Sequence, residues 1–228
     1  RMQILESQLG SRLFERNTGG ATLTPAGQRF QKHALILVRT VEQARQEVGV
    51  PRGFSGALTI GARLGLWEGL LLGWLPRMLA AAPDCTIRAE IGFEPDLMQG
   101  LIDGRLDLGV MYTPESRPGL QLVPALEERL LLVATADRSG PEDGYVYVDW
   151  GPEFLARHRA AFPDMDGPQL TVNIGWLGLQ HILANGGSGY FPERLVAAHL
   201  RARRLSVVPD APVFRLPAYV VCNDGGPA

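Results

Sequence analysis

Residues 4–27, ILESQLGSRLFERNTGGATLTPAG, constrain what this chain can fold into more than any other stretch. A helix is predicted at their start, because apolar residues repeat at helical spacing at Met2, Leu5 and Leu9. Gly10 follows as a typical helix C-cap. Residues 13–16 and 21–24 then predict two short strands, joined by a hairpin turn at residues 17–20.

A long helix is predicted directly after this hairpin. Thr24 is a favoured N-cap residue, and Pro25 suits the first helical position. A helix end, a small hairpin and a long helix in this order form the back half of a winged helix-turn-helix. Such modules bind DNA; the alternative is a protein-docking scaffold, in which Leu13, Phe14 and Leu23 would form the same core.

Short motifs in this stretch also make the chain resemble a known family. They read LE-x-x-LG-x-x-LF-x-R, a short wing and LT-x-AG, at Leu5-Glu6, Leu9-Gly10, Leu13-Phe14, Arg16, Leu23-Thr24 and Ala26-Gly27. The chain resembles the LysR-type transcriptional regulators, and residues 66–68 and 150–154 resemble the branch that includes a repressor of flagellar master-operon transcription. The resemblance implies a DNA-binding regulator whose C-terminal domain senses a small molecule and alters promoter binding.

The residues expected to contact double-stranded DNA lie in the first eighteen positions: Arg1, Gln3, Arg12, Arg16, Asn17 and Thr18. Arg1 and Gln3 match the end of the family's recognition helix. Arg12 and Arg16 are expected on the phosphate side, with the next two residues as hydrogen-bond donors. The alternative for Arg16 is a local ion pair with Glu15 or Glu6.

The charge distribution supports this assignment. The chain carries a formal net charge of −2, but residues 1–52 hold eight Arg and Lys against four acidic residues. The first 52 residues therefore carry +4 and the remainder −6. Basic charge at one end suits phosphate contact, and an acidic body limits nonspecific binding.

The long helix is predicted to pair with a second copy. Apolar residues follow one another in steps of four and three, which is a coiled-coil seam, at Phe30, Ala34, Leu37, Val41 and Val48. A homodimer or homotetramer is therefore expected, which would set the spacing of two DNA-reading units. The alternative is that this face packs on its own domain.

Strands alternate with helices after a breaker-rich hinge at residues 50–56, which predicts an α/β fold. Strands are predicted at residues 57–61, 86–91, 106–111, 129–134, 145–148, 170–174, 188–191, 213–216 and 218–221, and helices at 66–82, 95–103, 153–162, 177–184 and 193–201. The resemblance implies a two-lobed effector domain of the periplasmic-binding-protein type (type 2), in which Gly104 and Asp107 are structural.

Four units are therefore expected. They are the rear of the winged helix-turn-helix (1–23), a dimerisation helix (24–49), the hinge (50–56) and the effector domain (57–228), with lobe I at about 57–134 and 210–228 and lobe II at about 140–209.

A ligand in such a fold lies beyond the carboxyl ends of the strands. The residues expected to contact it are Arg63, Leu64, Gly65, Trp67, Phe93, Tyr112, Thr113 and Trp176, with backbone groups from a lobe crossing near residues 134–135. Arg63 and helix N-termini favour an anion, and the resemblance implies a small carboxylate. Against it, Glu94 is acidic, and residues 62–66 lack the hydroxyl that many family members place there. The alternatives are that Arg63 is solvated and that the aromatic residues only pack.

No catalytic constellation is found in the sequence, so an enzyme is not expected. The four histidines are scattered, and no metal or cofactor motif is present, so neither is expected. Cys85 and Cys222 are interpreted as buried thiols, with a redox sensor as the alternative. The rival function is a periplasmic-type solute-binding module without DNA binding.

No secretory signal or membrane-spanning run is seen, so a cytoplasmic location is expected. The chain opens inside a helix and stops where the family usually continues, so we expect it to be incomplete at both ends. The effector, the operator, activation or repression, and contact with RNA polymerase stay open at this point.

Overall fold

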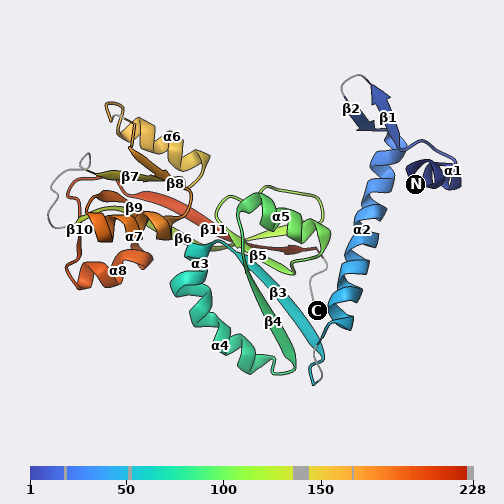
Figure 1. Ribbon diagram of the computed structural model, residues 1–228, viewed down its shortest axis with the longest axis horizontal. Coiled ribbons are helices and arrows are strands. Elements are labelled where there is room, and N and C mark those ends of the chain that lie inside the picture. The colour runs from blue at the N-terminus through green and yellow to red at the C-terminus, as the bar shows by residue number, and fades with distance from the viewer. Residues whose placement is uncertain (18–19, 51–52, 136–143, 166, 225–228) are drawn as a thin grey trace.

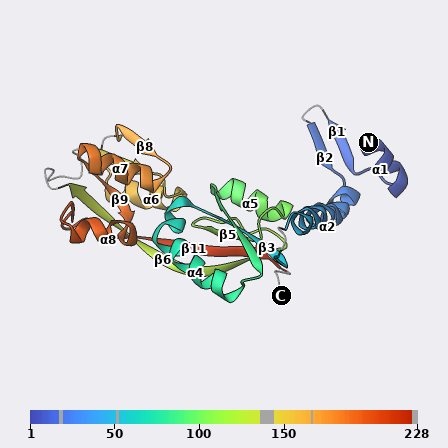
Figure 2. The ribbon, with the colours of Figure 1, turned by 60° about the horizontal axis from the view of Figure 1, so that its bottom comes forward.

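A long helix separates a small N-terminal unit from a two-lobed body in the computed structural model (Figure 1). The structure describes residues 1–17, 20–50, 53–135, 144–165 and 167–224. The N-terminal unit comprises α1 (Met2–Leu9), β1 (Phe14–Asn17) and β2 (Gly20–Leu23), and the long helix is α2 (Pro25–Val48). Figure 2 shows the same separation from another side. The predicted helix, hairpin and long helix are confirmed, with strand bounds that shift by one residue.

The hairpin is fixed to the first turn of α2 by the residues of the LTPAG segment. The Thr24 hydroxyl accepts a hydrogen bond from the Gly27 amide at 2.9 Å and donates one to the Arg12 carbonyl at 2.7 Å. The predicted N-cap is therefore confirmed. Gly27 is required by close approach, since a Cβ there would lie 2.1 Å from the carbonyl oxygen of Leu13.

The first lobe contains three parallel strands, β3 (Gly56–Ala62), β4 (Cys85–Ile91) and β5 (Leu108–Met111), with helices α4 (Leu72–Ala81) and α5 (Glu94–Asp103). The second lobe contains three further parallel strands, β7 (Tyr145–Val148), β8 (Leu170–Val172) and β9 (Ser188–Pro192), with helices α6 (Pro152–Ala161), α7 (Gly175–Asn185) and α8 (Glu193–Arg201). A short strand that the sequence did not predict, β10 (Leu205–Val207), completes this lobe.

Two long antiparallel strands join the lobes, β6 (Leu120–Thr135) and β11 (Phe214–Asn223) (Figure 1). The sequence predicted only residues 129–134 of β6, because the first half of the strand is largely exposed and is interrupted by Gln121, Pro124 and Glu127. It also divided β11 in two at Pro217, where the strand instead continues through a register shift between Ala218 and Tyr219. Residues 130–134 already pair with β9, so the chain crosses between the lobes earlier than the expected residues 134–135.

The predicted helix at residues 66–82 is wrong in one respect, because it is broken. A short helix, α3 (Leu64–Leu66), leads into an irregular segment, Trp67–Leu71, before α4 begins. Gly69 adopts a left-handed conformation with φ of 70°, which ends the first helical turn. Arg194 of α8 donates hydrogen bonds to the carbonyl oxygens of Gly65 and Glu68 at this break.

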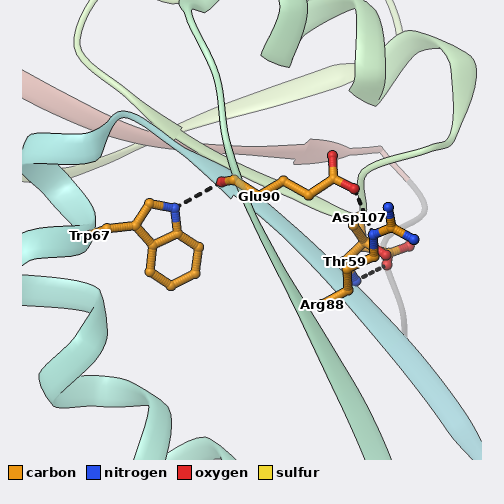
Figure 3. A network of polar contacts seen from close by, with 5 residues as sticks. All are labelled: Thr59, Trp67, Arg88, Glu90 and Asp107. Atoms are coloured by element: carbon orange, nitrogen blue, oxygen red, sulfur yellow. Dashed lines mark hydrogen bonds and ion pairs between the residues drawn. The ribbon is translucent and has the colours of Figure 1, made fainter. Parts of the chain in front are cut away.

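The segment around Asp107 is structural, as predicted. One carboxylate oxygen of Asp107 accepts a hydrogen bond from the Thr59 amide at 2.7 Å, and the Asp107 amide donates to the Thr59 carbonyl at 2.9 Å (Figure 3). Gly104 ends α5 in a left-handed conformation with φ of 75°. The turn between α5 and β5 is therefore tied to β3, which fixes the first lobe.

Both cysteines are free and half-buried, whereas the sequence interpretation placed them in the interior. Among the described residues, no helix combines the length and the apolar character that crossing a bilayer requires. Within the same residues, no three His, Cys, Asp or Glu side chains gather closely enough to hold a metal ion.

Candidate functional site

The cleft between the lobes is formed where five parallel strands end. The segments that follow β3, β4 and β5 in the first lobe face those that follow β7 and β8 in the second lobe. Two cavities of about 230 Å³ and about 160 Å³ lie there, and they share four lining residues, Arg63, Phe93, Tyr112 and Trp150. The larger cavity is also lined by Glu94, Pro95, Thr113, Asp149, Gly151 and Asn173. This is the position at which open α/β sheets bind ligands.

Arg63 joins the two sides of the cleft. It is only 9% exposed, and its guanidinium donates to the carbonyl oxygen of Asn173 in the second lobe at 2.7 Å. The same group pairs with Glu94 at 3.3 Å and lies 4.5 Å from the centre of the Phe93 ring. The alternative of a solvated Arg63 is therefore wrong, because three partners already hold its charge.

Tyr112 and Trp150 form the aromatic floor of the cleft. Their rings meet edge to face with centres 5.9 Å apart, and both residues are at most 5% exposed. Trp150 donates its ring N–H to the Tyr190 carbonyl at 2.9 Å. Gly175 leaves room for this ring, since a Cβ there would lie 2.3 Å from Trp150. Burial raises the pKa of Tyr112, so its hydroxyl stays protonated at neutral pH.

Six of the eight predicted effector residues line the two cavities: Arg63, Leu64, Gly65, Phe93, Tyr112 and Thr113. Two tryptophans lie elsewhere. Trp67 is 5% exposed in the core and donates its ring N–H to the Glu90 carbonyl at 2.8 Å (Figure 3). Trp176 is 42% exposed at the start of α7 and lines neither cavity.

From the second lobe the sequence reasoning selected Trp176 and missed the four residues that line the larger cavity. Asp149, Trp150 and Gly151 follow the predicted strand at residues 145–148, and Asn173 follows β8. The rule that selected the other loops, namely the carboxyl ends of strands, applies equally to these two. Applying it at the predicted strand end at residue 148 would have found Asp149, Trp150 and Gly151, whereas Asn173 lay inside the predicted strand at residues 170–174 and could not be found in this way.

The N-terminal unit presents a second candidate site, for nucleic acid. Arg1, Gln3 and Arg12 are exposed, and the last two border one shallow surface depression. Glu6 closes the turn between α1 and β1, because its carboxylate accepts the amides of Leu13 at 2.7 Å and Phe14 at 3.1 Å. The side chains of Arg16 and Asn17, and all of Thr18, lie outside the described residues, as do Pro51 and Arg52 of the predicted hinge.

A two-lobed α/β domain with an interlobe cleft, joined by a long helix to a helix-and-hairpin unit, is the architecture of a ligand-responsive transcriptional regulator. The family model described as "LysR substrate binding domain" matches residues 51–228, and the one described as "Bacterial regulatory helix-turn-helix protein, lysR family" matches residues 1–28. The chain belongs to the LysR family of transcriptional regulators, as its resemblance predicted. The match over residues 1–28 removes the rival of a solute-binding module without DNA binding.

Relatives and solved structures agree with this placement. The HTH-type transcriptional regulator HdfR of Yersinia pestis is 28% identical over 234 residues, which cover 97% of this chain and 78% of that protein. A full-length OxyR variant from Pseudomonas aeruginosa has a TM-score of 0.63 at 20% identity, over 99% of this chain and 78% of that chain. Full-length CbnR complexed with its target DNA has a TM-score of 0.56 at 20% identity, over 98% and 81%. At these identities the structural likeness shows the fold.

Proposed function

We propose that the protein is a homo-oligomeric, cytoplasmic regulator that binds promoter DNA through its N-terminal unit and senses a small molecule in the interlobe cleft. The observation that carries this proposal is the placement of the two sites in one chain. The DNA-binding unit is joined directly to α2, whose first turn is capped by Thr24. Helix α2 in turn leads to a two-lobed domain whose cavities lie between the lobes.

For DNA binding, Arg12 is the best-supported contact. It is exposed, and its carbonyl accepts the Thr24 hydroxyl at the start of α2, which anchors its backbone beside the hairpin. Arg1 and Gln3 lie on α1 or directly before it and would reach the same duplex. Arg16, Asn17 and Thr18 are proposed as the wing's contacts with the DNA backbone. The fold shared with the CbnR–DNA complex supports this arrangement.

For oligomerisation, α2 offers an apolar face to a second copy of the chain. Three residues of the predicted seam are exposed, Leu37 at 60%, Val41 at 51% and Val48 at 89%. Their exposure argues against the alternative that this part of the seam packs on its own domain. Burying these side chains against a second α2 helix would remove their apolar surface from water.

In the cleft, a small molecule would change how firmly the lobes are held together. Arg63 and Asn173 already join the two sides, so a ligand that binds between them favours one lobe arrangement over another. Transmission through the hinge to paired α2 helices would alter the spacing of the DNA-binding units. RNA polymerase is the further partner through which such a change would affect transcription.

The proposal is tested by measuring promoter binding of the protein against salt concentration. Arg12→Ala should weaken binding to all sequences alike and reduce the slope of log affinity against log salt by about 1. Arg204→Ala is the control, because this exposed arginine follows α8 in the second lobe. An unchanged slope for Arg12→Ala, or an equal change for Arg204→Ala, would contradict the DNA-binding role of the N-terminal unit.

A further inference from the structure

We infer that the cleft takes a small organic cation, an amine, amidine or guanidine on an apolar body. This inference rests on the proposed function, because it names the chemical class of the molecule sensed there. It differs from the carboxylate that Arg63 and the helix N-termini suggested in the sequence. Four features of the cleft support it: the negative charge of its lining, the pairing of Arg63 with Glu94 and Asn173, a hydroxyl without a hydrogen-bond partner among the described residues, and aromatic lining residues.

Formal charge in the cleft is negative. Three carboxylates line the two cavities, Glu94, Asp96 and Asp149, against a single guanidinium, that of Arg63. Asp96 and Asp149 are exposed, and one oxygen of Asp149 accepts the Gly151 amide at 3.0 Å. The lining therefore carries a formal charge of −2, which attracts a cation and repels a carboxylate.

Arg63 is already neutralised by its own surroundings. An incoming carboxylate would have to displace Glu94 from its 3.3 Å ion pair, and it would leave that carboxylate partly buried beside a second negative charge. The hydrogen bond to the Asn173 carbonyl at 2.7 Å also holds the guanidinium in place. The arginine therefore serves as a contact between the lobes in this structure, and a cation leaves that contact intact.

The Tyr112 hydroxyl is the second, independent indication of a ligand. Tyr112 is 3% exposed, and its hydroxyl has no hydrogen-bond partner among the described residues. The Tyr112 side chain lines both cavities, and its hydroxyl lies 3.6 Å from where a Cβ on Gly65, a residue of the smaller cavity's lining, would stand. A buried hydroxyl without a partner is unfavourable, and an N–H group of a bound cation would donate to its oxygen.

The aromatic lining residues suit the same ligand. Tyr112, Trp150 and Phe93 line both cavities, and the Arg63 guanidinium already lies 4.5 Å from the centre of the Phe93 ring. Aromatic faces attract organic cations, and carboxylates close by add to that attraction.

Helix N-termini offset part of this charge. Helix α5 begins with Glu94 and Asp96, two of the three carboxylates counted above, and its positive end reduces their effect. Helix α6 follows the lining residue Gly151 and has Glu153 in its first turn, whereas α7 has no acidic residue there. A helix N-terminus is equivalent to about half a positive charge. These helix ends therefore offset only part of the negative charge, and the carboxylates of Asp96 and Asp149 stay exposed at the cavities.

The test compares benzamidinium with benzoate, two planar single-ring ions of similar size and opposite charge, by calorimetric titration of the whole chain. Benzamidinium should bind in the millimolar range or tighter, and benzoate about tenfold more weakly or not at all. Tyr112→Phe should lower benzamidinium affinity several-fold without lowering stability, since the lost hydroxyl has no partner among the described residues. Asp149→Asn should lower it too, while its amide oxygen keeps the bond to Gly151.

A matched control is Glu115→Gln, which removes an exposed carboxylate that pairs with Arg117 and lines neither cavity. It should leave benzamidinium affinity unchanged. Preferential binding of benzoate that is lost in Arg63→Met would overturn the ligand class while the cleft stays the sensing site. Failure of benzamidinium to bind, or binding insensitive to Tyr112→Phe and Asp149→Asn, would also overturn the inference. Promoter binding and its salt slope are measured separately, so neither result bears on the DNA-binding role.

Discussion

At the scale of single residues, buried titratable side chains make the stability of this chain depend on pH. His158 is one of them, at 6% exposure within a group of aromatic side chains that includes Tyr145, Phe154 and Phe214. Its Nε2 lies 2.6 Å from the Tyr145 hydroxyl. Burial lowers the pKa of His158 below its ordinary value of 6.5.

This lowered pKa makes the stability of the second lobe depend on pH. In the unfolded chain His158 takes up a proton near pH 6.5, whereas in the folded protein it stays neutral to lower pH. The unfolded state then binds more protons, so the free energy of unfolding should fall as pH drops below 6.5 and hold its full value above it.

Urea denaturation at a series of pH values measures this effect. His158→Gln should flatten the dependence, and His33→Gln, on the exposed surface of α2, should leave it as in the wild type. Identical slopes in His158→Gln and the wild type would contradict the assignment to His158.

The sequence could predict which residues lie in the cleft where they directly follow a predicted strand, because ligands bind at the carboxyl ends of strands. Arg63, Phe93 and Tyr112 follow strands whose apolar runs are evident, so their place in the cleft could be predicted. Trp67 could not be placed, because the direction of its ring depends on the helix break at Gly69, which α8 stabilises from the other lobe. The ion pair between Arg63 and Glu94 likewise depends on how two loops meet.

At the scale of elements, α2 connects the two functions, and its start and its middle have different roles. Its start is fixed by Thr24, whose hydroxyl accepts the Gly27 amide and donates to the Arg12 carbonyl. Its middle exposes apolar side chains. Local signals define both features, which is why the sequence predicted this helix to within a residue.

Thr24→Ala should loosen the first turn of α2 by about 1–2 kcal/mol, because the N-cap bond is lost. Hydrogen exchange at the Gly27 amide should become faster. Thr40→Ala is the control on the same helix, since the Thr40 hydroxyl only donates to the Ile36 carbonyl on an exposed face. Equal exchange rates at Gly27 in the wild type and Thr24→Ala would contradict the role of the cap.

The pairing of α2 is tested by two neighbouring substitutions. Leu37 and Ile36 are almost equally exposed, at 60% and 58%, but only Leu37 lies on the predicted seam. Leu37→Glu should shift the protein towards monomer in analytical ultracentrifugation, because a charge would be buried between the helices. Ile36→Glu should leave the molar mass of the assembly in solution the same as in the wild type. If both variants dissociate or neither does, the seam is misplaced.

At the scale of the whole molecule, two arginines join the lobes from opposite directions. Arg63 reaches from the first lobe to Asn173, and Arg194 of α8 reaches from the second lobe to the carbonyls of Gly65 and Glu68. No sequence pattern indicates these bonds, because they join segments more than one hundred residues apart. Arg194 also pairs with Glu128, whose side chain is only 5% exposed.

Arg194→Ala should lower the free energy of unfolding by about 3–5 kcal/mol, since Glu128 would stay buried without its partner. Arg215→Ala is the matched control, because it breaks the ion pair of the neighbouring Glu127 on the surface and should cost less than about 1 kcal/mol. Urea denaturation followed by tryptophan fluorescence compares them. Similar losses in the two variants would contradict the role assigned to Arg194.

The central claim is that contacts between the lobes control promoter binding by the distant N-terminal unit. The most direct measurement compares the wild type with Arg63→Met at one promoter that the protein binds, by DNA footprinting and by binding affinity. The methionine keeps apolar contact with Phe93 and removes the hydrogen bond to Asn173. The account predicts that affinity or footprint length changes at this promoter, while affinity for unrelated DNA stays the same. An identical footprint and affinity in a folded Arg63→Met protein would contradict it.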